Sequence, residues 1–295
     1  MRAGLPLRAV SIACGLMASA TLAAADPPAA IPKRGDVYEL RLAYATAEKS
    51  ENDQGSSSSN GTTVLIERVI AISPDGAELE YDLPPDAKPE DRLRQWQFPA
   101  RIFRPNSGSA RLINQAALEA RLGAWLATSK ISRTACGRWV FTWNAFKIEC
   151  DPISVLKTIA SVDMGWDKRV EGALFSTHAA AGPAKLARTS GVAGSSLTAD
   201  LALNVDHVRK ERAEADVVVG EIMREPVKLE QAMQARAKEK ISGSVSVVMS
   251  LDTADREIKR VTTTTMRRQE AEGQVFNATS TETLQKRLLT SVSGS

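Results

Sequence analysis

The stretch VYELRLAYAT, residues 37–46, carries the clearest strand pattern in the sequence. Its large apolar residues fall at every second position: Tyr38, Leu40, Leu42 and Tyr44. The charged residues Glu39 and Arg41 take the positions between them. This alternation is typical of a strand with one buried face, because successive side chains of an extended chain point to opposite sides. The stretch therefore predicts a sheet with an apolar side and a solvated side.

Similar patterns recur near both ends of the chain. Two more strands are expected at residues 63–72 and 78–83, joined by the turn sequence Ser73-Pro74-Asp75-Gly76. Three Thr-rich and Val-rich strands are expected at residues 245–251, 258–266 and 275–284. The polar run at residues 48–62 predicts a flexible, exposed loop. Each end of the chain is thus expected to form a β-meander.

Helical patterns dominate the middle of the chain. Apolar residues at helical spacing predict a helix over residues 115–127, after an extended segment at 95–104. Asp151-Pro152 predicts a second helix start, because Asp caps free amides and Pro fits the first turn. A segment from residue 206 fits a helix, although Val217-Val218-Val219 also fits a strand. A further helix is expected from Leu229, and the pattern assigns nothing to residues 172–198.

These elements predict a single α+β domain over residues 37–295. Its antiparallel sheet is built from the N- and C-terminal meanders and packs on several helices and a disulfide-stapled aromatic hairpin. A curved sheet over helices resembles the architecture of periplasmic half-barrel lipid or lipoprotein carriers. The resemblance concerns the order of strands and helices, and it transfers no functional residue to this chain.

The hairpin is expected within CGRWVFTWNAFKIEC, residues 136–150. Its two halves alternate like strands, and a turn near residues 142–144 would bring Cys136 and Cys150 opposite each other. We expect a structural disulfide between them, since neither a CxxC spacing nor neighbouring histidines favours a redox or metal site.

All five tryptophans and five of the six phenylalanines fall between residues 96 and 175. Two interpretations fit this concentration. Aromatic residues dominate buried area in any domain, which favours ordinary core packing. Exposed aromatic residues also form binding surfaces, and the candidates for a ligand groove are Trp96, Trp139, Phe141, Trp143 and Trp166.

The first 25 residues have the features of an export signal. Arg2 and Arg8 precede an uncharged, Ala-rich stretch, and small residues lead to a cleavage site expected after Ala25. Residues 26–36 would then form a linker. The apolar stretch is short for a membrane anchor, and Ser11 does not fit a lipidation motif for Cys14. We expect a protein of the periplasm, or one secreted beyond it, without a transmembrane anchor after processing.

Charge and motifs narrow the function classes. The chain has 38 basic and 35 acidic residues, and removing Arg2 and Arg8 with the leader leaves 36 basic residues, a nearly neutral balance. Interspersed charges of both signs do not favour nucleic-acid binding. Nucleotide-binding loops, the GxSxG elbow and the HExxH zinc motif do not occur after residue 25. No cofactor is expected.

Few residues remain for catalysis or metal binding. The chain has two histidines. His207 and Glu211 have the spacing of a metal pair on one helix face, but the spacing supplies no third ligand, so an exposed helix face is expected. His178 is expected in a surface loop. Asp163 and Asp167 flank Trp166 and could imitate a sugar-cleaving carboxylate pair, although such residues more often cap a helix end. No catalytic or metal-binding residue is therefore predicted.

The expected role is an exported envelope protein that binds or carries an apolar ligand such as a lipid or a lipoprotein acyl chain, without catalysis. The alternatives are an interaction module that docks on another envelope protein and a cell-wall or glycan hydrolase that uses Asp163 and Asp167.

Overall fold

A computed structural model describes residues 32–51, 55–141, 145–191, 194–270 and 272–290. The α-helices are α1 Pro89–Arg94, α2 Gln115–Thr128, α3 Val155–Val162, α4 Val205–Met223 and α5 Leu229–Arg236. Two short 3-10 helices are η1 Arg133–Ala135 and η2 Pro152–Ser154. In the described ranges, no helix combines the length and hydropathy needed to cross a bilayer.

Most strands belong to one ten-stranded antiparallel sheet with the order β10-β11-β12-β13-β14-β1-β2-β3-β4-β5. Its strands are β1 Val37–Ser50, β2 Ser56–Ser73, β3 Gly76–Asp82, β4 Ala100–Pro105, β5 Arg111–Leu112, β10 Ala187–Gly191, β11 Gly194–Ala202, β12 Lys240–Leu251, β13 Glu257–Gln269 and β14 Val275–Thr290. Two small pairs, β6 Trp139–Phe141 with β7 Ala145–Lys147 and β8 Leu174–Phe175 with β9 Ala184–Lys185, stand apart.

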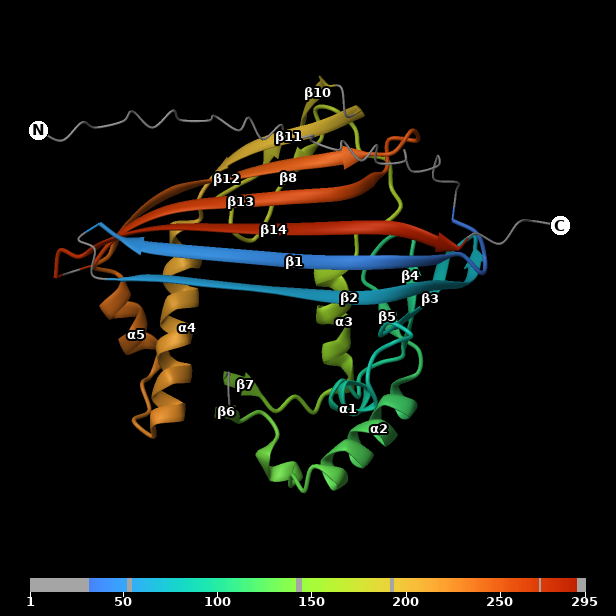
Figure 1. Ribbon diagram of the computed structural model, residues 1–295, viewed down its shortest axis with the longest axis horizontal. Coiled ribbons are helices and arrows are strands. Elements are labelled where there is room, and N and C mark those ends of the chain that lie inside the picture. The colour runs from blue at the N-terminus through green and yellow to red at the C-terminus, as the bar shows by residue number, and fades with distance from the viewer. Residues whose placement is uncertain (1–31, 52–54, 142–144, 192–193, 271, 291–295) are drawn as a thin grey trace, which may run out of the picture.

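The two meanders meet in the middle of the sheet, where β1 pairs with β14 from Val37↔Thr290 to Ser50↔Phe276. Figure 1 shows this central pair in blue and red, with the helices on one side of the strands. The α+β class and the shared antiparallel sheet are therefore confirmed.

A larger hydrophobic cluster fills the space between one end of the sheet and α2 and α3. It contains sheet residues such as Leu40, Leu65, Leu79 and Ile102 and helix residues such as Leu118, Leu122, Val155 and Ile159. These helix positions repeat every three to four residues, so each helix lays one apolar stripe on the sheet. Leu118 and Leu122 are fully buried, as the spacing in residues 115–127 predicts.

A smaller hydrophobic cluster lies under the other end of the sheet. Strands β11 and β12 contribute Leu197, Ala199, Leu201, Val245, Val247 and Met249. The segment between α3 and β10 covers them with Ala180 and Leu186, and Val208 of α4 packs at its border. The sheet thus has two separate apolar supports on its helix side rather than one continuous core.

The structure contradicts the flexible loop that was predicted for residues 48–62. Instead of a loop, β1 continues to Ser50 and β2 begins at Ser56, with Lys49 opposite Ser56. The run reads as a loop because Ser, Asn and Gly have low strand propensity. Here the backbone ladder holds residues 48–50 and 56–62 in strands, and the Thr46 and Ser59 hydroxyls add a 2.8 Å hydrogen bond.

Other boundaries also differ from the patterns. Residues 89–94 form α1, so the strand expected from residue 95 begins only at Ala100. Val217-Val218-Val219 lies inside α4, where the helix prevails over the strand preference of β-branched residues. The unassigned residues 172–198 contain β8, β9, β10 and the start of β11.

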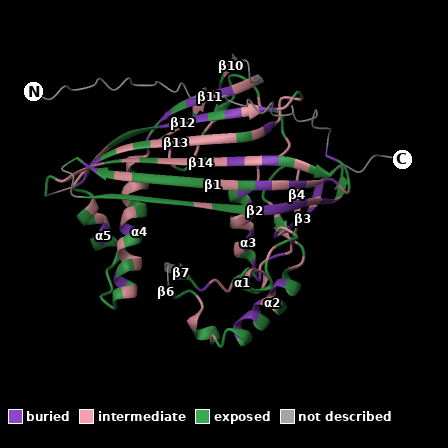
Figure 2. Cartoon of the chain, viewed as in Figure 1, coloured by how far each residue is buried: buried purple, intermediate pink, exposed green. Residues whose placement is uncertain are grey.

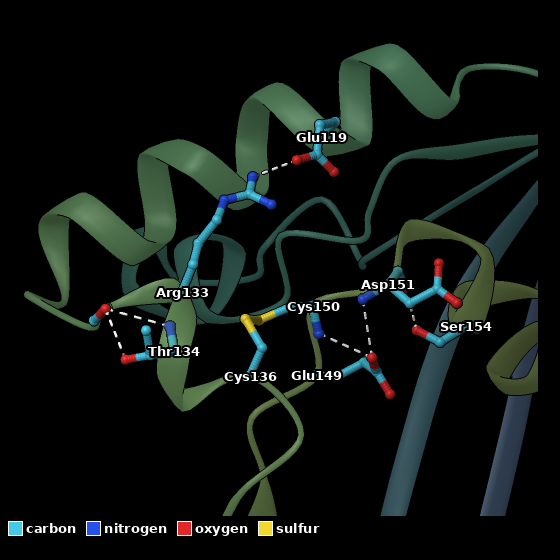
Figure 3. Close-up of a disulfide and its surroundings, with 9 residues drawn as sticks. Glu119, Arg133, Thr134, Cys136, Glu149, Cys150, Asp151 and Ser154 are labelled. Atoms are coloured by element: carbon cyan, nitrogen blue, oxygen red, sulfur yellow. Dashed lines mark hydrogen bonds and ion pairs between the residues drawn. A yellow bond between two sulfur atoms is a disulfide. The ribbon is translucent and has the colours of Figure 1, made fainter.

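The disulfide between Cys136 and Cys150 is present, with Cα atoms 5.6 Å apart. It joins the end of η1 to the segment before η2 (Figure 3). Beside it, Glu149 accepts hydrogen bonds from the amides of Cys150 and Asp151 at 2.8 and 2.9 Å. Between the cysteines β6 and β7 pair antiparallel, whereas the expected turn at 142–144 lies outside the described residues.

Candidate functional site

The helix-side face of β1 changes along its length from covered to open. Tyr38 and Leu40 are buried in the larger cluster, Leu42 is half-buried, and Tyr44 is 46% exposed. All four share one face because side chains alternate along a strand. Figure 2 shows the same change from buried to exposed along β1. The middle of the sheet is therefore open to solvent on the side that carries the helices.

We name this exposed part the open face and define it by Tyr44 and the neighbours that share its side of β1, β2 and β14: Thr46, Ser59, Gly61, Thr63 and Glu282. Thr46, Ser59, Thr63 and Glu282 are exposed. Leu42 and the buried Leu284 border the open face toward the larger cluster. It therefore combines an aromatic ring, hydroxyl groups and one carboxylate.

Gly61 explains how Tyr44 lies in the open face. The two residues are cross-strand partners. A Cβ atom on Gly61 would lie 2.5 Å from the Tyr44 ring, so the ring lies across the glycine rather than projecting from the sheet. Because glycine has no side chain, the aromatic ring of the neighbouring strand can pack flat against its backbone. One aromatic ring therefore lies flat against the exposed surface of the sheet.

A buried charge network borders the covered end of the same face. Lys286 donates a 2.7 Å hydrogen bond to Glu67, which also accepts a 2.8 Å bond from the Tyr81 hydroxyl. Burial lowers the pKa of Lys286, and the Glu67 charge offsets part of that effect. Burial raises the pKa of Tyr81, and Glu67 adds to the rise. Lys286, Glu67 and Tyr81 thus supply hydrogen-bond partners to one another inside an apolar cluster.

Trp166 lies beside this network and contacts two cations. The Arg104 guanidinium lies 4.0 Å from the centre of the indole, and the Lys286 ammonium lies 5.3 Å from it. Cations over an indole face are held by its negative quadrupole. Trp166 is half-buried against the larger cluster, so this proposed groove residue borders the Lys286 network.

The other groove candidates are distributed differently. Trp96 is 4% exposed and belongs to the larger cluster, which agrees with the core-packing alternative. Trp139 lies in β6, where its amide donates a 3.1 Å hydrogen bond to Glu221 of α4. The Phe141 side chain and all of Trp143 lie outside the described residues, as does Ala25. Of the five candidates, Trp96 therefore lies in the core, and the sequence pattern did not single out Tyr44 as a groove residue.

Asp163 and Asp167, the pair considered for glycan hydrolysis, have different environments. Asp163 accepts two hydrogen bonds from Arg104, at 2.8 and 3.1 Å, and one from the amide of Gly165 at 2.8 Å. Asp167 is exposed. Asp163 thus stabilises the end of α3 and holds Arg104 against Trp166. For Asp163, this agrees with the helix-capping alternative to glycan hydrolysis.

The opposite face of the same strands carries a hollow of about 430 Å³. All of its lining residues except Ala47 are of polar or charged types: Ala47, Glu48, Lys49, Ser56, Ser57, Ser58, Asn277 and Thr279. Most of these positions alternate with the open face in the strand register. Glu48 and Ser57 are the exceptions and share the side of the open face, so the hollow lies mainly, but not wholly, on the other side of the sheet.

The two histidines meet at the start of α4. His207 Nε2 lies 3.1 Å from Glu211 Oε1, and the rings of His178 and His207 are 5.3 Å apart between centres. The i, i+4 spacing of His207 and Glu211 predicted that both lie on one face of the helix. No local sequence pattern could predict that His178 lies beside them, because the tertiary fold brings it there.

Comparisons with known proteins assign no family. The sequence matches no protein-family model, and no curated protein matches it significantly. One solved structure, titled "Crystal structure of bifunctional dehydratase-cyclase domain in ambruticin biosynthesis", aligns with 86% of this chain and 76% of its own at 13% identity, with a TM-score of 0.09. A score that low carries no argument about fold or function.

Proposed function

We propose that the protein is an exported, non-enzymatic binding protein that holds an apolar ligand of the lipid or lipoprotein acyl class on the open face of its sheet. The observation that carries the proposal is the exposed Tyr44 ring, which lies flat in the middle of the helix-side face. That face is buried at both ends by separate apolar clusters. A large aromatic residue left exposed between two covered regions is a typical feature of a binding surface.

The composition of the open face indicates which part of such a ligand it would contact. Leu42 and the Tyr44 ring suit an acyl chain, whereas Thr46, Ser59 and Glu282 suit a polar headgroup. The ligand would therefore be an amphiphile that lies along β1, with its apolar end toward the larger cluster.

The Cys136–Cys150 bridge supports export, since disulfides form and persist mainly in oxidising compartments. Cell fractionation with an antibody against the protein tests this part. We expect a chain shortened at Ala25 in the periplasmic or secreted fraction. A full-length chain in the cytosol would contradict it.

Ligand binding is tested with purified protein and a fluorescent long-chain fatty acid. We expect saturable binding that a Tyr44→Glu variant weakens by at least ~10-fold, the scale of one lost aromatic contact. Ala45→Glu is the matched control, because Ala45 is the next residue of β1, is also exposed and faces the opposite side. Equal loss in both variants, or no binding by the original protein, would contradict the proposal.

A second candidate function is docking on another envelope protein. The far end of the α4–α5 pair exposes Val219, Met223, Val227 and Leu229, at 57%, 64%, 36% and 42%. An exposed apolar group of this kind suits a protein contact. Cross-linking in intact cells separates the two functions. Cross-linking to one dominant protein partner that is lost in a Met223→Glu variant would support docking. Unchanged fatty acid binding in the same variant would show that the docking surface and the open face are separate.

A further inference from the structure

Both histidines of the chain converge with Glu211 at one position. His178 precedes α4 by a long segment of sequence, yet one side-chain ligand atom from each of His178, His207 and Glu211 lies within 4.8 Å of the other two. Two imidazoles and a carboxylate are a donor set that zinc prefers. We propose that His178, His207 and Glu211 bind a divalent transition metal, Zn²⁺ in the first place, with a fourth position open to water.

The backbone fixes His178 beside α4. The amide of Asn204 donates a 2.7 Å hydrogen bond to the Ala179 carbonyl, and the amide of Ala181 donates a 2.9 Å bond to the Ala202 carbonyl. Ala180 and Leu203 form a β-bridge between these bonds. The segment that directly follows His178 is thus tied to the segment that leads into α4. The backbones of His178 and His207 are therefore held near each other before any metal binds.

The start of α4 positions the other two ligands. Asn204 caps the helix by accepting a 3.0 Å hydrogen bond from the amide of His207. Glu211 follows one turn later, so its side chain lies on the same helix face as that of His207. A capped first turn holds His207 at a fixed height against the His178 loop. The helix thus presents an i, i+4 ligand pair to a third ligand from outside.

The distances fit a zinc centre after small side-chain rotations. Zinc bonds of about 2.0–2.1 Å to nitrogen or oxygen place tetrahedral ligand atoms roughly 3.3 Å apart. The 3.1 Å between His207 Nε2 and Glu211 Oε1 is close to that separation. The 5.3 Å between the two ring centres leaves space for a small ion at the ring edges. His178 and Glu211 are exposed, so both side chains can adjust and an ion can enter.

A simple ion pair between His207 and Glu211, without a metal, is the alternative explanation for this contact. However, His207 Nε2 is buried and forms no hydrogen bond of acceptable geometry, despite the short distance to Glu211. A buried nitrogen without a hydrogen bond costs free energy unless another partner satisfies it. A metal ion bound to that nitrogen would satisfy it and would also use the Glu211 charge.

Neighbouring charges leave the site accessible to a cation. Arg209 is engaged by Asp206 and by the Glu239 carbonyl, and Lys210 pairs with Glu214. The positive end of the α4 dipole opposes a cation here, and the Glu211 carboxylate counters that effect.

The test is a zinc titration of the full chain, produced without a polyhistidine tag and freed of metal by a chelator. Calorimetry should show one ion bound per chain with a Kd of ~1 μM or tighter. Co²⁺ in place of Zn²⁺ should give the visible absorption of a four-coordinate site. His178→Asn and Glu211→Gln should each weaken zinc binding by at least ~100-fold, the upper end of what loss of a mere supporting residue causes.

Glu214→Gln is the matched control, because Glu214 is an exposed carboxylate one turn from Lys210 on the same helix. It should bind zinc as the original protein does. Far-ultraviolet circular dichroism would establish that every variant is folded. Wild-type affinity in folded His178→Asn, or the absence of zinc binding in the original protein, would overturn the proposal. Both results are independent of fatty acid binding, so this site and the open face are tested separately.

Discussion

Lys286 of β14 and Glu67 of β2 form an ion pair across β1, with Nζ 2.7 Å from Oε1 and both side chains under 10% exposed. The pair lies inside the larger hydrophobic cluster, next to Leu40 and the Tyr38 ring. Each charge depends on the other, because water reaches neither. A buried pair of this kind fixes the register of the strands that carry it.

Removing one member of this pair should destabilise the protein more than removing both. Lys286→Met leaves Glu67 buried without its cation, and we expect a loss of about 3–5 kcal/mol in the free energy of unfolding. Adding Glu67→Gln should recover much of that loss, since the new side chain is uncharged and its amide oxygen can still accept from Tyr81. Urea unfolding of the four proteins of this cycle provides the measurement. Additive losses would show that the two charges do not interact.

Glu239 should make stability depend on acid pH. Burial alone would raise the pKa of Glu239, but hydrogen bonds from Arg236 and Arg212 outweigh it, and the pKa lies below its ordinary value of 4.5. A lowered carboxyl pKa contributes stability above pH 4.5 that is lost as the pH falls through the folded-state pKa. The stability difference between the original protein and Glu239→Gln should therefore be constant near neutral pH and shrink in acid. A difference independent of pH would contradict this.

The Cys136–Cys150 bridge should contribute about 3 kcal/mol, because it closes a loop of about 15 residues in the unfolded chain. The double variant Cys136→Ser with Cys150→Ser should unfold at correspondingly lower urea concentration. In chains processed at Ala25, thiol titration under denaturing conditions should find no free thiol before reduction and two afterwards. Two free thiols before reduction would show that the bridge does not form.

Two glycines should respond differently to alanine. At Gly61 the three atoms nearest to the added Cβ all belong to the Tyr44 side chain, which can rotate away, so Gly61→Ala should leave stability nearly unchanged but weaken fatty acid binding. At Gly243 the added Cβ would overlap the Thr265 carbonyl oxygen, which the ladder holds in place. Gly243→Ala should cost about 1–3 kcal/mol. Equal stability of the two variants would argue against the fixed strand contact at Gly243.

The fold was largely predictable because its strands and helices carry strong periodicity. Alternation at Tyr38, Leu40 and Leu42 predicted the central strand, and the i, i+4 spacing of Leu118 and Leu122 predicted α2. The loop predicted for residues 48–62 was wrong, because backbone pairing with neighbouring strands, rather than side-chain preference, holds residues 48–50 and 56–62 extended. Sequence patterns indicate the local strand propensity of each residue, whereas a strand of exposed serines forms only because neighbouring strands pair with it.

The candidate sites were less predictable for a related reason. Alternation placed Tyr44 on the same face as Leu40, but it could not show that the core ends at Leu42. The contact of His178 with His207 depends on the β-bridge between Ala180 and Leu203, which joins segments with no shared local pattern. Periodicity assigns a residue to a face, and only the assembled fold shows what covers that face.

The ladder between β1 and β14 also sets the order in which the protein can fold. Val37 is among the first described residues to leave the ribosome and Thr290 among the last, yet they are paired. Until β14 is available, one edge of β1 has no partner and offers its amides and carbonyls to other chains. Folding should therefore be slow and completed only after synthesis, when the most distant contacts can form. During that interval the chain would benefit from a chaperone that covers β1.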